Sequence, residues 1–312
     1  MRIAVVGKWG SGKSTVTSVL IKTLHEYNKL VSVIDADINQ HMIWLLTKEK
    51  LRLPLLSDKS NMNIIREYLL WTRSDVELHQ FVKSTPPSSK SNLWSIDKSS
   101  FLINKFWFEV KNNIFVMNIW SYDSEWIAKS CYHNNLAIAE NILSHHKDDK
   151  DEYLICDMVA WTDAFAWSMY AQFDLVLFVI EATEESMEVY NQFLRLAKTA
   201  NINNRVEVIA NKVIDDDDIT YIKSRIEWKD LLWYIWYNHE WLKDRRRWET
   251  IFTSNALDVN KSIDFPSMQN YKLSNKERIE AIIKAHEQYC SQAYVKKRIW
   301  DWLVQIEKWF SY

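Results

Sequence analysis

The sequence predicts an α/β fold with a mostly parallel central sheet flanked by helices. Two observations predict this fold. Short apolar runs rich in β-branched residues alternate along the chain with longer segments of helical periodicity. In addition, the first apolar run, a glycine loop, a helical segment and a second apolar run follow one another within about 35 residues, which is the spacing of a β-α-β unit. A sheet built from such units is covered by helices on both faces.

The expected elements follow in chain order. Strands are expected at residues 2–6, 31–34, 153–156, 175–180 and 206–210, and helices at residues 14–27 and 184–200. Residues 47–113 are less regular, and the run T-P-P-S-S at residues 85–89 indicates a loop. From Asn275 to the end the pattern is helical. We therefore expect residues 1–260 to form one domain and residues 261–312 to be a helical C-terminal extension of the same domain.

The composition argues against several classes of protein. The 312 residues are 47% apolar and 26% charged, and the net charge of −2 gives no overall basic field that would favour nucleic acid. No apolar run reaches the roughly 18 residues of a membrane span. Cys131, Cys156 and Cys290 are an odd number without paired spacing, which is typical of a reducing compartment. We expect a cytoplasmic protein.

A phosphate-binding loop follows the first expected strand. The run Gly7-Lys8-Trp9-Gly10-Ser11-Gly12-Lys13-Ser14 fits the pattern G-x-x-x-x-G-K-[ST] and leads directly into the first expected helix. Glycines let successive backbone N–H groups face a phosphate, and the helix N-terminus adds partial positive charge. Lys13 is expected to reach the β- and γ-phosphates and Ser14 to bind magnesium. Residues 1–260 are therefore expected to bind a nucleotide through Gly7, Gly10, Ser11, Gly12, Lys13, Ser14 and Thr15.

Lys8 makes this loop resemble that of one family. A lysine at the second position of the motif is the signature of the deviant Walker A loop in the MinD/ParA/Mrp-type P-loop ATPases of the SIMIBI class, which include the CooC group. The loop here is similar to it, with Trp9 in place of the first of the paired glycines. The resemblance implies a dimer around ATP in which Lys8 crosses to the partner subunit's nucleotide, as an arginine finger does. The alternative is an exposed lysine near a phosphate site.

Acidic residues end two of the expected strands. Asp35 and Asp37 close the second strand, and the resemblance assigns Asp37 to orienting the attacking water and Asp35 to supporting the magnesium shell. Asp157 ends the strand at residues 153–156, as in a Walker B strand, and is expected to bind magnesium through water. The alternatives are acids that cap a helix or simply end a strand.

The resemblance extends to two further segments. Residues 157–161 resemble the family's switch II pattern D-x-x-A-G, but Trp161 occupies the glycine position, which puts the backbone contact to the γ-phosphate in doubt. Asn211 and Lys212 follow the strand at residues 206–210 and look like the family's base-contacting Asn-Lys. Guanine-specific proteins carry an aspartate three residues after the asparagine, where this chain has Ile214. Adenine is therefore favoured.

The chain has 17 tryptophans and only 3 glycines, all of them in the phosphate loop. An α/β fold needs glycine at turns and helix caps. Trp9, Trp161 and Trp167 lie where proteins of the resembled family carry glycine. Our hypothesis is that many of the tryptophans are glycines in the organism, misread from a UGA codon under the wrong genetic code. The alternative is a truly tryptophan-rich or redesigned protein, and UGG codons at Trp9 and Trp161 would exclude the hypothesis.

Two further features of the sequence are weak signals, one for metal binding and one for membrane binding. Cys131 and His133 offer two metal ligands, whereas a structural zinc site needs four, and the C-x-C metal pair of the CooC group is absent. In the tail, Lys296, Lys297 and Arg298 precede apolar residues, a pattern found in amphipathic helices that bind membrane surfaces. Docking of the tail on the domain is the favoured interpretation.

Together these features predict a magnesium-dependent ATPase that dimerises around ATP and switches the interaction with an unidentified protein partner or cargo, in metal-centre maturation or partition. The predicted roles are catalysis for Lys8, Lys13 and Asp37, metal binding for Ser14, Asp35 and Asp157, and base binding for Asn211 and Lys212. Two alternatives stay open. One is a small-molecule kinase or ligase on a P-loop scaffold, and the other is a hydrolysis-impaired nucleotide-binding module.

Overall fold

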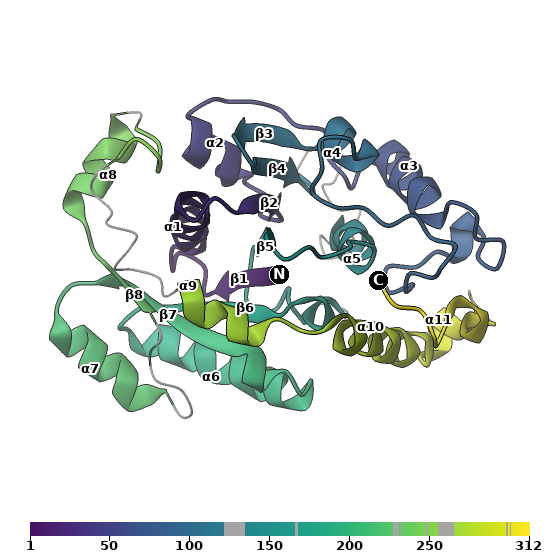
Figure 1. Cartoon of the computed structure of the whole chain (residues 1–312). Coiled ribbons are helices and arrows are strands. Elements are labelled where there is room, and N and C mark those ends of the chain that lie inside the picture. Colours follow the sequence, from purple (N-terminus) through teal and green to yellow (C-terminus); the bar gives the residue numbers. More distant parts are fainter. Residues whose placement is uncertain are drawn as a thin grey trace.

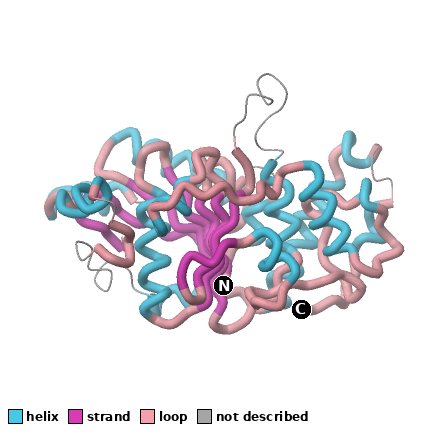
Figure 2. Tube along the Cα trace, turned by 90° about the horizontal axis from the view of Figure 1, so that it is seen from above, coloured by secondary structure: helices cyan, strands magenta, loops and turns pink. Residues whose placement is uncertain are grey.

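The fold is a single sheet between two layers of helices (Figures 1 and 2). The computed structural model describes residues 1–121, 135–165, 168–226, 231, 233–247, 249–254, 265–297, 299 and 301–312. In this part of the chain the sheet has eight strands in the order β3-β4-β2-β5-β1-β6-β7-β8. All neighbouring pairs are parallel except β3 and β4. The predicted α/β class with a mostly parallel sheet is confirmed.

The five predicted strands all form, and three further strands join them. The strands are β1 (Arg2–Gly7), β2 (Leu30–Asp35), β3 (Phe108–Lys111), β4 (Ile114–Asn118), β5 (Glu152–Asp157), β6 (Leu175–Ile180), β7 (Val206–Val213) and β8 (Trp233–Trp236). The unpredicted strands are β3, β4 and β8. Two of them, β3 and β8, are four-residue strands at the edges of the sheet, whose patterns are too short to identify without their neighbours.

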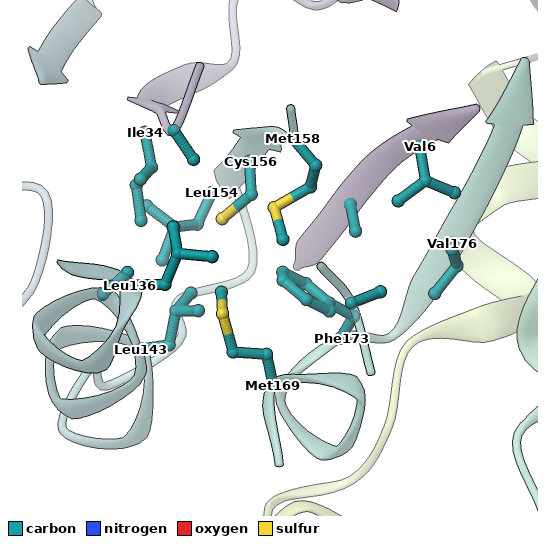
Figure 3. Close-up of a cluster of buried hydrophobic side chains, with 14 of the residues drawn as sticks. Val6, Ile34, Leu136, Leu143, Leu154, Cys156, Met158, Met169, Phe173 and Val176 are labelled. Carbon is teal, nitrogen blue, oxygen red and sulfur yellow. The ribbon is translucent and has the colours of Figure 1, made fainter. Parts of the chain in front are cut away.

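Helices cover the two faces through two apolar clusters. One face is covered by α1 (Lys13–Glu26), α2 (His41–Thr47), α8 (His239–Arg246) and α9 (Phe265–Met268). The other face is covered by α3 (Lys59–Leu70), α4 (Phe101–Phe106), α5 (Ala137–Ser144), α6 (Glu184–Thr199) and α7 (Asp216–Arg225). In this second cluster Leu143, Met169 and Phe173 gather around Cys156 and Met158 (Figure 3). No helix in the described ranges is long and apolar enough to cross a membrane.

The C-terminal extension is helical only in its first part. Helix α10 (Asn275–Cys290) begins at a capping box formed by Ser274 and Glu277. After Cys290 the described residues form only the short helix α11 (Ala293–Lys296) and the 3₁₀ turn Trp302–Gln305. The predicted helix from Asn275 to the end is therefore wrong beyond Cys290.

Contacts with the domain explain why the tail is not one helix. Arg73 donates through Nη2 to the carbonyl oxygen of Gln305 at 3.0 Å, and Thr85 donates to the Gln305 side chain at 3.0 Å. At the end of the chain, the hydroxyl of Tyr312 donates to the carbonyl oxygen of Ser144 at 2.6 Å. In a continuous helix the carbonyl oxygen of Gln305 would instead accept a hydrogen bond from within the helix. The described part of the tail is docked on the domain.

The parallel strands place the candidate residues at one edge of the sheet. Asp35 at the end of β2 and Asp157 at the end of β5 are register partners, and β1 lies on the other side of β5. Gly7 at the end of β1 is paired with Val179 of β6. Ligands of open α/β sheets bind in the crevice beyond these carboxyl ends. The fold therefore brings the glycine loop and the predicted acids together.

Candidate functional site

The phosphate loop joins β1 to α1 with a backbone that only glycine adopts freely. Gly10 and Gly12 have φ values of +83° and +88°, in the left-handed region. A Cβ atom on Gly12 would also lie 2.2 Å from Nδ2 of Asn211. Both the backbone conformation and the close packing therefore require glycine at position 12.

A cavity of about 220 Å³ opens directly above this loop. The structure brings together the residues that line it, which are Trp9, Gly10, Gly12, Lys13, Ser14, Thr15, Asp37, Asn39, His41 and Leu45. The predicted loop residues and Asp37 thus meet at one site. Asn39 and His41 were missed by the sequence analysis, because only the fold of the segment after β2 brings them to the loop.

Lys13 and Lys8 have different surroundings in the loop. The ammonium group of Lys13 donates to the carbonyl oxygen of Lys8 at 3.2 Å, and burial lowers the pKa of Lys13 although Asp157, Asp37 and Asp163 raise it. Lys8 does not line the cavity. A backbone hydrogen bond and the positive charge of Lys8 lower the pKa of Glu185, which places Lys8 near the first turn of α6. Lys13 thus lines the cavity, whereas Lys8 does not.

Asp157 is a buried acid with one oxygen left without a partner. Its Oδ1 atom accepts a hydrogen bond from the hydroxyl of Thr17 at 3.1 Å. Its Oδ2 atom is buried and has no hydrogen-bond partner among the described residues. Burial raises the pKa of Asp157 to about 6, although Ser14, Lys13 and Thr17 favour the charged form. A buried carboxylate oxygen of this kind, next to a serine hydroxyl, fits a magnesium ion and its water shell.

Asp35 and Asp37 have different environments. Asp35 is fully buried, and its two oxygens accept the backbone N–H groups of Asp37 at 3.1 Å and Met42 at 3.0 Å. Burial and the nearby charge of Asp157 raise the pKa of Asp35 well above its usual value. Asp37 lines the cavity, where one of its oxygens accepts two hydrogen bonds from Asn39, each of 2.8 Å. Asp35 therefore holds the backbone that positions Asp37.

Asn211 and Lys212 bond to the phosphate loop from the end of β7. Asn211 donates through Nδ2 to the carbonyl oxygen of Ser11 at 2.7 Å, and Lys212 donates through Nζ to that of Gly10 at 2.8 Å. Lys212 also forms an ion pair with Glu181. These contacts brace the loop over a sequence separation of 200 residues. The predicted contact with a base stays a prediction.

The segment after Asp157 forms a compact turn closed by Asp163. The backbone N–H of Ala160 donates to Oδ2 of Asp163 at 2.9 Å, and the N–H of Asp163 donates to the carbonyl oxygen of Ala160 at 3.2 Å. Trp161 is partly buried and packs against the apolar cluster beneath it. Asp163 was missed by the sequence analysis, although it is fully buried and its charge acts on Lys13.

Some predicted residues lie outside the described part of the chain. These are Cys131, His133, Trp167 and Arg298. Within the described ranges, no group of three or more His, Cys, Asp and Glu side chains is arranged to hold a metal ion by itself. This is compatible with a magnesium site in which a hydroxyl, water and phosphate oxygens supply most of the ligands.

Comparisons with known proteins agree with this geometry, although no protein-family model matches the chain. An uncharacterised ATP-binding protein of Methanocaldococcus jannaschii is 26% identical over 282 residues, which are 88% of this chain and 99% of the relative. The carbon monoxide dehydrogenase accessory protein CooC of Rhodospirillum rubrum is 24% identical over 232 residues, which are 74% of this chain and 82% of the relative.

Two solved structures have the same fold. The ATP complex of a Cyanothece McdA variant has a TM-score of 0.52 and 13% identity, covering 91% of this chain and 95% of that one. A ParA family ATPase from Chlorobium tepidum has a TM-score of 0.50 and 14% identity, covering 90% and 97%. The chain therefore has the fold of P-loop proteins of the MinD/ParA type, with its glycine loop between β1 and α1. Within that class its relatives in sequence are proteins named as ATP-binding or as CooC.

Proposed function

We propose that the chain is a magnesium-dependent ATPase that dimerises around ATP and so controls a protein partner or a cargo. The observation that carries the proposal is the buried, unpartnered Oδ2 atom of Asp157 beside the loop residues Lys13 and Ser14. A buried carboxylate oxygen without a hydrogen-bond partner is costly, and a bound cation removes that cost. The relatives named as ATP-binding and the ATP complex of the similar fold support ATP as the nucleotide.

The residues of the loop would hold the phosphates. Backbone N–H groups of residues 10–15 and the start of α1 would face the β- and γ-phosphates, and Lys13 would move from the carbonyl oxygen of Lys8 to a phosphate oxygen. Ser14 would ligate magnesium directly and Asp157 through water, with Asp35 positioning the neighbouring backbone. Magnesium, when bound, neutralises charge on the phosphates during transfer.

Asp37 and Lys8 complete the proposed catalysis. Asp37 lines the cavity and would accept a hydrogen bond from the attacking water. Lys8 lies outside the cavity of its own subunit, which supports a role at the nucleotide of a second subunit. Ile214 in place of the guanine-reading aspartate is 74% exposed, and adenine is the base that we propose.

Binding is tested by titrating a fluorescent ATP analogue, with and without magnesium. We expect Lys13→Ala to abolish binding, and Asp157→Asn to remove the dependence on magnesium while leaving a weaker binding of the nucleotide alone. Asp216→Asn, on the first turn of α7, is the matched control and is expected to behave as the wild type. Equal magnesium dependence in Asp157→Asn and the wild type would contradict the proposed metal site.

Dimerisation is tested by the solution mass with and without Mg-ATP. We expect a monomer that becomes a dimer only with ATP, and a Lys8→Ala variant that binds ATP but stays a monomer. Unchanged mass in the wild type despite ATP binding would exclude the dimer and favour a P-loop kinase or ligase, which transfers phosphate to an acceptor. The accessory role named for the CooC relative supports a partner protein as the target of the switch.

A second candidate function is a nucleotide-binding module with impaired hydrolysis. The observation in its favour is Trp161, whose ring packs against the core at the position where the resembled switch II has glycine. Phosphate release by the wild type and by Trp161→Gly separates the two candidates. Turnover that rises at least tenfold in the variant favours the impaired module, and equal turnover favours the active switch.

A further inference from the structure

A second cavity lies away from the phosphate loop, between the end of α6, the 3₁₀ turn Met169–Gln172 and α10. Its volume is about 470 Å³, in the range of cavities that hold small organic molecules. None of its described lining residues belongs to the phosphate-loop cavity. The cavity is therefore separate from the phosphate-loop cavity.

The apolar walls of this cavity are held in place. The Phe165 ring packs 5.0 Å from the ring of Phe193 and 6.1 Å from that of Tyr170, measured between centroids. The hydroxyl of Tyr170 donates to the side chain of Gln288 on α10 at 3.2 Å. Because contacts within the protein hold these walls in place, binding requires little ordering of side chains.

The charge on the lining residues has one sign. Arg205 and Lys284 line the cavity, and none of the described lining residues is acidic. Lys284 makes no hydrogen bond or ion pair with any described residue, and Arg205 uses Nη1 for the carbonyl oxygen of Phe173 at 2.8 Å, which leaves other guanidinium donors for a ligand. Behind the lining residue Ser168 lies the buried acid Glu140, whose pKa burial raises to about 7 although Lys83 favours its charged form.

We propose that this cavity binds a small organic anion with an apolar, ring-sized body. The acidic group of the ligand pairs with Lys284 and Arg205, and its body lies against the rings of Phe165, Tyr170 and Tyr289. Two lining cations favour a negatively charged ligand, with Lys284 as the principal one because the charges of Asp174 and Glu277 already act on Arg205. Aromatic walls favour a flat apolar body.

The test uses two probes of the same shape on the intact chain. These are 8-anilinonaphthalene-1-sulfonate, which is an anion, and N-phenyl-1-naphthylamine, which is neutral. In fluorescence titrations we expect the anion to bind at one site and Lys284→Gln to weaken its binding about fivefold, as for a partly exposed ion pair. The neutral probe should bind more weakly, with an affinity that Lys284→Gln leaves unchanged.

A matched control and a filled cavity complete the test. Lys276 lies on the same helix and its side chain is 84% exposed. The control variant Lys276→Gln should therefore bind the anion with the affinity of the wild type. Ala281→Phe fills the cavity and should abolish binding of both probes without changing the circular dichroism spectrum. Equal affinities of Lys284→Gln and Lys276→Gln, or displacement of the anion by Mg-ATP, would overturn the proposal.

Discussion

At the residue scale, four of the tryptophans bear on whether these residues are native. Trp71 follows α3 with φ +48° and ψ −106°, a conformation that side chains rarely adopt, and it is 64% exposed. Three other tryptophans are buried and each donates its indole N–H to a protein oxygen, namely Trp94, Trp107 and Trp120. A buried ring with a hydrogen-bonded indole N–H is the environment expected for a native tryptophan. The hypothesis of misread glycines is therefore tested best at Trp71.

We predict that Trp71→Gly stabilises the protein by about 1 kcal/mol, because it relieves backbone strain while removing little buried surface. Urea denaturation measures the change. Trp71→Ala is the control, since it removes the ring but keeps the Cβ atom and the strain. An equal gain in both variants would show that the positive φ is not the cause.

A second prediction at this scale concerns His286 and its effect on stability at acid pH. Burial, together with the positive charge of Arg73, lowers the pKa of His286 to about 4 and that of His145 to about 3. Both stay neutral in the folded protein but gain a proton near pH 6.5 when unfolded, so stability is lost as the pH falls below 6.5. Between pH 6 and 4.5 each contributes a slope of about 1.4 kcal/mol per pH unit.

The variant His286→Gln should reduce this slope by about 1.4 kcal/mol per pH unit, measured by urea denaturation at several pH values. His79→Gln is the control, because the His79 side chain is 65% exposed. A slope in His286→Gln that equals the wild-type slope would mean that His286 is protonated in the folded protein.

At the element scale, the loop before α1 depends on β7. Asn211 and Lys212 donate to the loop carbonyls of Ser11 and Gly10, so two backbone groups that face away from the cavity are satisfied from a distant strand. The N–H group of Ser11 is used within the loop by the carbonyl oxygen of Lys8 at 3.2 Å, so the N–H groups after it and in the first turn of α1 are the ones that can face a phosphate. The brace fixes the shape of this short glycine loop through contacts within the protein.

We predict that Lys212→Met weakens binding of ATP about tenfold, because a loosened loop must be reordered on binding. Because the brace acts on the phosphate loop and not on the base, we expect an equal loss of affinity for inorganic tripolyphosphate, which has no base. Competition with a fluorescent ATP analogue measures both affinities. A loss confined to ATP would show that Lys212 acts on the base instead of the loop.

At the scale of the whole molecule, buried ion pairs join the C-terminal extension to the first strand. Arg278 of α10 lies 2.6 Å from Asp174 and 2.8 Å from Asp148, and Arg2 of β1 lies 2.8 Å from Asp148. Burial alone would raise the pKa of Asp148, but Arg2 and Arg278 hold it well below its usual range. This network is at the end of the sheet opposite the phosphate loop, since Arg2 begins the strand that Gly7 ends.

We predict that Arg278→Met destabilises the protein by about 3–5 kcal/mol, because it leaves buried carboxylates without their partner. Urea denaturation and hydrogen exchange of α10 measure the effect, and Lys276→Met on the same helix is the exposed control. Similar stability of both variants would contradict a structural role for the network. Binding of nucleotide at the opposite end should survive wherever the Arg278→Met protein remains folded.

The sequence by itself determined the features that depend on local patterns of neighbouring residues. The glycine loop, the first βαβ unit and the acids that end β2 and β5 are local patterns, and each was confirmed in position. Periodicity and motif spacing carry this information because hydrogen bonds within a helix and alternation along a strand involve near neighbours.

Only the tertiary structure decided the features that join distant residues. The brace from β7 to the loop, the unpaired oxygen of Asp157 and the docked tail all depend on contacts across more than 100 positions or on burial. The edge strands β3 and β8 likewise need a neighbour to form. Such contacts arise when the chain closes on itself, and no local pattern in the sequence specifies them.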